Sequence, residues 1–304
     1  KLLQVETQFG DARNCLHNKA LQYGYREKQM GPDTALVLDV AEHAGQFSEG
    51  TTLAPVLAST LKPLGSTIYE RTSSDGGCVP PGMNKARVSA GFDMVVLGMN
   101  DIVSSEIARF GQWEIATADD MAKRAGTSLA ESGTFLDIGA NIGYYTLLFA
   151  HKGFNVIAVE AMTRNRQAIM GSLCLNPHLR SRVTLVPTAL AAPFEVDFAT
   201  CIIKSTNSKI NIGNGHLSCG PDKKCDSGDA NCQPVELKTL DSVLADLSPA
   251  SVDVMKMDVE EHECQVLAGG DSLFSKYHPK LLQVETQFGD ARNCLHNKAL
   301  QYGY

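Results

Sequence analysis

Residues 135–148 read FLDIGANIGYYTLL and combine three structural signals. A short apolar run ends in Asp137, a glycine turn follows, and a second apolar run has the length of a helix. The next apolar run, VIAVE at residues 156–160, ends in Glu160. Strand, turn, helix and strand in this order predict a parallel sheet with Asp137 and Glu160 at the carboxyl ends of its strands, where such sheets bind ligands.

The same alternation continues along the chain. Further strand candidates are RVTLVPTAL, VDVMKMD and KLLQVET, at residues 182–190, 252–258 and 280–286. Helical patterns separate them, and residues 100–126 also look mostly helical. Strands that are apolar on both faces and alternate with helices predict an α/β fold, with a mostly parallel, Rossmann-like sheet and helices on both faces.

The composition narrows the range of partners. The chain has 304 residues, of which 43% are hydrophobic, and a formal net charge of −7. No basic stripe occurs, which argues against a nucleic-acid backbone as the main partner. No apolar run approaches the roughly 18 residues of a membrane span. No signal peptide is visible, which slightly favours the cytoplasm but leaves the compartment open.

The cysteines give no metal site. Cys174 and Cys264 lie in apolar helical patterns, and we expect them to be small core residues. Cys219, Cys225 and Cys232 are spaced six and seven apart, which fits no common zinc pattern. A disulfide, as in a secreted relative, and free thiols on a loop remain open for these three.

The turn itself indicates the kind of ligand. Gly139 and Gly143 let the backbone turn sharply and approach a ligand closely, and Glu160 has two oxygens for the two ribose hydroxyls. Dinucleotides prefer G-x-G-x-x-G, whereas this turn reads G-x-x-x-G after Asp137. That carboxylate would repel a pyrophosphate but suits the ammonium group of S-adenosylmethionine. Together with Asn141, these residues favour S-adenosylmethionine over NAD and over a turn that binds nothing.

Five segments, in order, resemble the FkbM-type methyltransferase family. They are FLDIGANIGYYTLLFA, VIAVEA, LKTLDSVL, VDVMKMDVEEHECQVLAGG and HPKLLQVE, and the resemblance spans roughly residues 100–285. It implies a class I S-adenosylmethionine-dependent methyltransferase, usually one that methylates oxygen in sugars or secondary metabolites. It also implies that Ala161, after the ribose-binding acid, lies at the cofactor, although the family commonly has proline there. Glu261 stands where the family usually has glycine.

Methyl transfer to a hydroxyl requires a group that removes the proton of the acceptor. Asp258 ends its strand and is the first candidate for orienting the acceptor or acting as the base, followed by Glu260 and His262. His262 could equally be a solvated residue of a first helical turn, and Lys256 is expected to be an ion-pair partner. The expected acceptor is a small molecule or a glycan. The alternatives are a non-catalytic binding module, with Glu261 spoiling the chemistry, and an NAD-linked oxidoreductase.

A perfect duplication complicates the domain organisation. Residues 1–25 and 280–304 are identical at all 25 positions. We predict an N-terminal segment, residues 1–78, that carries the duplicate and supplies extra strands, and a methyltransferase domain, residues 79–304, with a surface insertion at residues 205–233.

Within this division the second copy is the one expected in the sheet. We assign Leu281–Thr286 to the sheet beside Val252–Asp258 and expect the first copy to be surplus, because two identical strands should compete for one place. The segments TALVLDV at residues 34–40 and STIYE at residues 66–70 are candidate strands around a candidate helix at residues 54–65.

Overall fold

The structure is a computed structural model. It describes residues 2–5, 25–30, 33–38, 77–98, 101–197, 200–205, 211–286 and 290–303, the first three ranges by their backbone. The candidate strand at residues 66–70 and the candidate helix at residues 54–65 lie outside these ranges. Within the ranges, no helix is both long and apolar enough to cross a bilayer.

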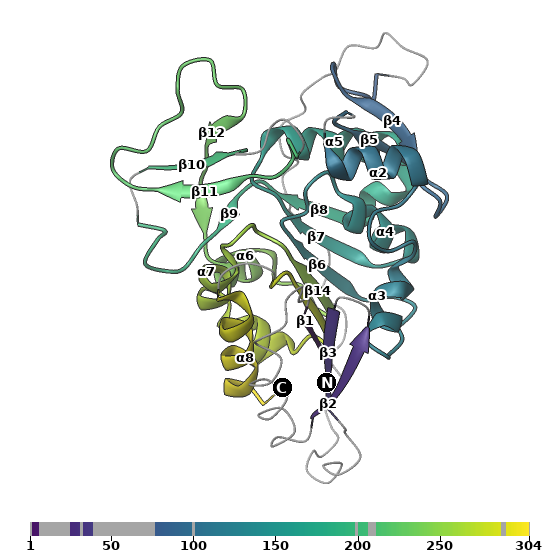
Figure 1. The fold of residues 1–304 in the computed structure, drawn as a ribbon, viewed down its shortest axis with the longest axis vertical. Coiled ribbons are helices and arrows are strands. Elements are labelled where there is room, and N and C mark those ends of the chain that lie inside the picture. The colour runs from purple at the N-terminus through teal and green to yellow at the C-terminus, as the bar shows by residue number, and fades with distance from the viewer. Residues whose placement is uncertain are drawn as a thin grey trace.

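Five parallel strands form the centre of the sheet (Figure 1), in the spatial order β15, β14, β6, β7, β8. Their bounds are β6 Thr134–Ile138, β7 Asn155–Val159, β8 Val183–Val186, β14 Val254–Met257 and β15 Leu281–Val284. This arrangement confirms the predicted α/β fold. It also confirms the place of residues 281–284 beside residues 254–257.

Helices cover both faces of this sheet (Figure 1). One face packs against α2 Ile102–Phe110, α3 Ala118–Arg124, α4 Tyr144–Lys152 and α5 Thr163–Leu175, and the other against α6 Leu240–Leu247, α7 Glu263–Ala268 and α8 Ala291–Gln301. A 3-10 helix, η2 Pro177–Arg182, precedes β8, and a π-helical turn, η3 Leu273–Tyr277, precedes β15.

The alternation of side chains along β6 explains why two helical layers are needed. Phe135 points to the first layer and stacks on Phe149 of α4 with ring centroids 3.7 Å apart, whereas Leu136 and Ile138 belong to the core beneath the second layer. All five residues of β6 are buried. A strand that is apolar on both faces is stable only when both faces are covered.

Three N-terminal strands extend the sheet beyond β15. They are β1 Leu2–Val5, β2 Tyr25–Met30 and β3 Asp33–Leu38, and the complete order is β2-β3-β1-β15-β14-β6-β7-β8. β3 includes residues 34–38 of the candidate strand at residues 34–40, whose last two residues lie outside the described ranges.

The two identical strands, β1 and β15, therefore lie side by side. They are parallel and in register, with Leu2 opposite Leu281 and Val5 opposite Val284. The expectation that they compete for one place is wrong, because the outer edge of β15 offers a second place with the same hydrogen-bonding pattern. β3 then pairs antiparallel with the far side of β1.

The insertion contributes to a small separate sheet that begins just before it. Its strands are β10 Cys201–Lys204, β11 His216–Cys219 and β12 Cys232–Pro234, in the order β11-β10-β12. Disulfides join Cys201 to Cys219 and Cys225 to Cys232. Two smaller pairs of strands complete the fold, namely β4 Asn84–Arg87 with β5 Asp93–Val96, and β9 Ala189–Leu190 with β13 Leu237–Lys238.

Two more disulfides correct the assignment of Cys174 and Cys264 as core residues. Cys174 of α5 is bonded to Cys78, and Cys264 of α7 is bonded to Cys294 of α8. Each bond ties a sheet-covering helix to a segment remote in sequence. Apolar neighbours along a helix do not show whether a cysteine faces a distant partner, which is why the sequence pattern was misleading.

Candidate functional site

A cavity opens at the carboxyl ends of the central strands. Its walls come from the segments that follow β6, β7, β8 and β14, and from the insertion. The lining residues are Ile138, Gly139, Asn141, Val159, Glu160, Ala161, Met162, Thr188, Ala189, Leu190, Ile203, Gly213, Asn214, Gly215, Leu217, Asp258, Val259, Glu260 and His262. This is the edge at which an open α/β sheet binds a ligand.

The turn after β6 brings two strand ends into direct contact. Gly139 has φ +74°, and a Cβ at this position would lie 1.8 Å from the carbonyl oxygen of Asp258. Only glycine fits there. Gly143 has φ +88° and precedes α4, where a Cβ would lie 2.8 Å from Ile169. Gly139 lines the cavity, whereas Gly143 shapes the turn from behind.

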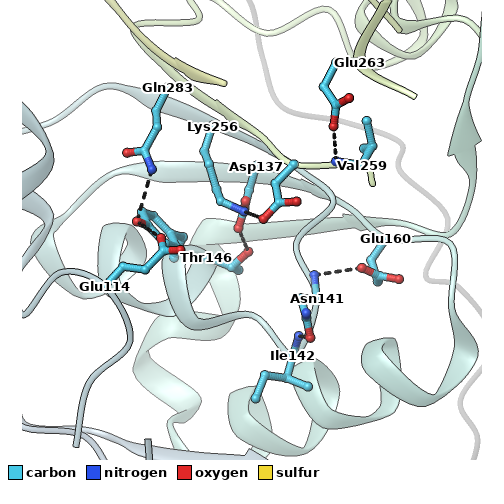
Figure 2. Close-up of polar contacts among 12 residues, drawn as sticks. Glu114, Asp137, Asn141, Ile142, Thr146, Glu160, Lys256, Val259, Glu263 and Gln283 are labelled. Carbon is cyan, nitrogen blue, oxygen red and sulfur yellow. Dashed lines mark hydrogen bonds and ion pairs between the residues drawn. The ribbon is translucent and has the colours of Figure 1, made fainter. Parts of the chain in front are cut away.

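Glu160 is buried and already oriented by the backbone. Asn141 N donates to its Oε2 at 2.8 Å (Figure 2), and Met162 N donates to its Oε1 at 2.7 Å. A carboxylate oxygen can accept more than one hydrogen bond, so the Glu160 carboxylate can still accept hydrogen bonds from ligand hydroxyls. Burial raises the pKa of Glu160 to about 7, although the hydrogen bonds from Met162 and Asn141 act to lower it. The carboxylate therefore fits the two hydroxyls of a ribose, and Ala161 lines the cavity beside it.

Asp137 is fully buried and lies outside the residues that line the cavity. Its Oδ2 accepts a hydrogen bond from the Thr146 hydroxyl at 2.6 Å (Figure 2), and its Oδ1 is buried without a hydrogen-bond partner among the described residues. Burial raises its pKa, against the charge of Lys256. An unpaired buried acceptor is unusual, and the binding of a ligand ammonium by Asp137 stays a prediction.

Lys256, in β14, supplies the positive charge that balances the carboxylates at this end of the sheet. Its Nζ lies 3.0 Å from Oδ2 of Asp258, as expected for an ion-pair partner (Figure 2). Burial disfavours the lysine charge, but the carboxylates of Asp258, Asp137 and Glu114 together raise its pKa. Burial likewise opposes the charge of Asp258, yet Lys256 and hydrogen bonds hold the pKa of Asp258 below its usual value. Asp258 is therefore ionised at neutral pH.

Glu260 and Glu261 follow in consecutive left-handed conformations, with φ 52° and 72°. Glu260 lines the cavity, and burial together with the charge of Asp258 raises its pKa to about 7. Glu261 is exposed and is not among the lining residues. The bulky charge expected at the active edge of the sheet thus points to solvent.

His262 lines the cavity close to a residue that the sequence analysis missed. Its Nε2 lies 3.2 Å from Oε2 of Glu195, in a contact that is not a well-aligned hydrogen bond. Burial lowers the pKa of His262, against the charge of Glu195. The predicted alternative of a solvated histidine does not fit this half-buried position.

The structure brings most of the predicted site residues together. Those that line one cavity are Gly139, Asn141, Glu160, Ala161, Asp258, Glu260 and His262, whereas Asp137 and Gly143 lie behind it. Among the described residues, no group of three or more histidine, cysteine, aspartate or glutamate side chains could hold a metal ion.

Other residues at the site were not predicted. Glu285 follows β15, and burial and the charge of Asp258 raise its pKa far above the usual value. The insertion contributes Gly213, Asn214 and Gly215 to the cavity. The spacing of these two glycines within a polar segment was the available signal, because glycine permits close approach to another backbone.

Comparisons with known proteins identify the family of the chain. The profile of the family described as "Methyltransferase FkbM domain" matches residues 137–304, more than half of the chain. A similar solved structure is the methyltransferase FkbM from Methylobacillus flagellatus KT, with 20% sequence identity and a TM-score of 0.41. The match covers 61% of this chain and 42% of that one. No functionally curated protein matches the chain. The family match shows that the chain belongs to the FkbM methyltransferase family, whose members use S-adenosylmethionine.

Proposed function

We propose that the protein is an S-adenosylmethionine-dependent O-methyltransferase that acts on a hydroxyl group of a small molecule or a glycan. The observation that carries the proposal is one cavity that combines the backbone-oriented carboxylate of Glu160 with the acidic residues Asp258 and Glu260. The first carboxylate suits a ribose, and the other two suit an acceptor hydroxyl and its proton.

The cofactor side is formed by the segments after β6 and β7. Glu160 would bind both ribose hydroxyls, with Gly139, Asn141 and Ala161 along the same wall. Asp137 would bind the methionine ammonium from behind the turn, where its Oδ1 lacks a partner. S-adenosylmethionine supplies an electrophilic methyl group when bound, so the protein mainly has to place the acceptor in line with it.

The acceptor side needs one group that orients the hydroxyl and one that removes its proton. Asp258, kept ionised by Lys256, is suited to orientation. The pKa of Glu260, about 7, allows it to take up a proton near neutral pH. His262 is a second base, because burial keeps its imidazole neutral.

A non-catalytic binding module is the second candidate, and it rests on Glu261 in place of the usual glycine. The exposed side chain of Glu261 argues against it, because the side chain does not obstruct the cavity. A methyl-transfer assay with a panel of hydroxylated acceptors separates the two candidates, since a module that only binds the cofactor transfers no methyl group to any of them.

Calorimetric titration with S-adenosylmethionine and with NAD tests the cofactor site. We expect wild type to bind S-adenosylmethionine but not NAD, and Glu160→Ala to weaken binding by about 1.5–3 kcal/mol, the scale of hydrogen bonds to a charged group. The matched control is Glu131→Ala, which removes an exposed carboxylate. Equal affinity in wild type and Glu160→Ala would contradict the proposal.

A further inference from the structure

The insertion forms part of the wall of the cofactor cavity. Four of its residues line the cavity, namely Gly213, Asn214, Gly215 and Leu217, and Ile203 of β10, just before the insertion, lines it as well. Residues 213–215, here called the clasp, belong to the connection between β10 and β11 and approach the turns after β6 and β7 closely. The sequence analysis predicted only a surface insertion, so its place at the cavity wall needs an explanation.

Two buried side chains hold the backbone of the clasp. Gly213 N donates to Oδ1 of Asp101 at 3.1 Å, and Nδ2 of Asn165 donates to Gly213 O at 2.9 Å. Asp101 is 0% exposed and Asn165 is 1% exposed. Because burying such groups is costly unless they are hydrogen-bonded, these contacts fix the clasp to the starts of α2 and α5.

The two glycines of the clasp pack against the residues that orient Glu160. A Cβ on Gly213 would lie 2.8 Å from Oδ1 of Asn141, and a Cβ on Gly215 would lie 2.6 Å from Sδ of Met162. Asn141 and Met162 are the two residues whose backbone N–H groups hold the Glu160 carboxylate. The clasp therefore packs closely against both residues that orient Glu160, the proposed ribose-binding group.

Two further contacts link the insertion to the same region. The side chain of Asn165, which bonds to Gly213, also acts to lower the pKa of Glu160. Gln233, in β12, accepts from Thr163 N at 2.8 Å and donates to Ala161 O at 3.1 Å. Contacts from two separate parts of the insertion thus converge on residues 160–165.

We propose that the clasp closes over the ribose side of the cofactor, and that Asp101 and Asn165 are positioning residues that hold it closed. Cofactor exchange then requires the clasp to lift from Asn141 and Met162, so that the insertion controls both the affinity and the residence time of the cofactor. This inference rests on the proposed binding of S-adenosylmethionine at Glu160.

Asp101→Ser tests the clasp without removing the cap of α2. Asp101 accepts from Ser104 N through Oδ2, and serine is an equally good N-cap, but its side chain is too short to reach Gly213 as well. Gly213→Ala is the second variant, because it pushes the clasp away from Asn141 and leaves α2 untouched. Asp222→Ser, at an exposed position of the insertion, is the matched control.

Affinity is measured by calorimetry with S-adenosylmethionine, dissociation by stopped-flow dilution, and folding by thermal unfolding of the cofactor-free protein. We expect Asp101→Ser and Gly213→Ala each to weaken binding about tenfold and to speed dissociation, as for the loss of one hydrogen bond to a charged group. Hydrogen exchange at residues 211–217 should rise in both variants, and Asp222→Ser should behave like wild type.

The outcomes separate the two proposals. If wild type does not bind S-adenosylmethionine, or if Glu160→Ala binds it equally well, the cofactor site is wrong. If Glu160→Ala weakens binding while the folded clasp variants bind and release the cofactor like wild type, the cofactor site stands and the clasp is overturned. Should Asp101→Ser fail to fold, Gly213→Ala decides alone.

Discussion

Glu261 adopts a backbone conformation that costs a glutamate free energy but costs a glycine almost none. Its φ of 72° is left-handed, its side chain is exposed, and the family usually has glycine at this position. We expect Glu261→Gly to stabilise the fold by about 1 kcal/mol, because the steric cost of the left-handed conformation disappears. Methyl transfer should be preserved or raised.

Urea unfolding and a methyl-transfer assay check this prediction. The control is Glu261→Ala, which removes the charge but keeps a Cβ in the left-handed region and so should gain little stability. A large loss of activity in Glu261→Gly would show instead that the Glu261 carboxylate takes part in the reaction.

The buried carboxylate of Glu160 makes stability depend on pH. Burial raises its pKa to about 7 in the folded chain, from 4.5 for an ordinary glutamate. Between these values the folded state holds a proton that the unfolded state has lost, so the free energy of unfolding falls as the pH rises from 4.5 to 7. Glu260, also with a pKa of about 7, acts in the same direction.

The measurement is urea unfolding of the cofactor-free protein at about pH 5 and about pH 8. Glu160→Gln should reduce the loss of stability between the two conditions, because its amide does not titrate. Glu131→Gln, at an exposed position, serves as the control. An unchanged loss in Glu160→Gln would assign the effect to other groups.

At the scale of single elements, the central strands were predictable and their surroundings were not. The strands β6, β7 and β14 are apolar on both faces, and this pattern has few explanations other than a covered parallel sheet. The polar insertion has no such pattern, because its small sheet is held by disulfides and by contacts with residues 161–165. Local sequence does not show that kind of support.

The residues of the candidate site were likewise predictable only in part. Residues at strand ends, such as Glu160 and Asp258, were predictable because every parallel strand delivers its last side chains to one edge. Asp101, Asn165 and Glu195 reach the site through tertiary contacts from other elements. Asp137 also ends a strand, yet it is turned inward to the Thr146 hydroxyl.

The disulfides differ in the length of chain they close, and this difference can be measured. Cys78 and Cys174 are 96 residues apart, whereas Cys225 and Cys232 are 7 apart. Loop-closure entropy predicts a loss of about 4–5 kcal/mol for Cys78→Ser with Cys174→Ser, and about 2 kcal/mol for Cys225→Ser with Cys232→Ser. Urea unfolding under oxidising conditions gives both values, and a reversed order would refute the entropic account.

For the whole molecule, the four disulfides bear on the compartment. The eight cysteines of the described residues are all paired. Disulfides form and persist in oxidising compartments and are rare in the cytosol. The pairing therefore favours a secreted or lumenal protein, in contrast to the slight preference for the cytoplasm drawn from the sequence.

The two copies of the duplicated strand have different positions in the sheet and should tolerate a charge differently. Val284 in β15 is 0% exposed, and only β14 separates β15 from β6, so Val284→Asp should cost about 3 kcal/mol or more and abolish cofactor binding. Val5 lies in β1, farther from the cavity, and we expect Val5→Asp to weaken the N-terminal strands while cofactor binding persists.

Thermal unfolding and calorimetric titration of both variants measure these effects. If Val5→Asp abolishes binding and Val284→Asp leaves it intact, then β1 and not β15 occupies the place beside β14.

The register of β1 on β15 has a consequence for self-association. Identical segments that stack parallel and in register form the repeating unit of a fibril, in which each rung is a template for the next. Here the stack has two rungs, and β3 covers the outer one with an antiparallel strand of different sequence. The hairpin of β2 and β3 therefore prevents a further identical strand from pairing with β1. A molecule that loses it presents an LLQV edge that matches the LLQV segment of every other copy, and growth from that edge ends only where another hairpin closes it.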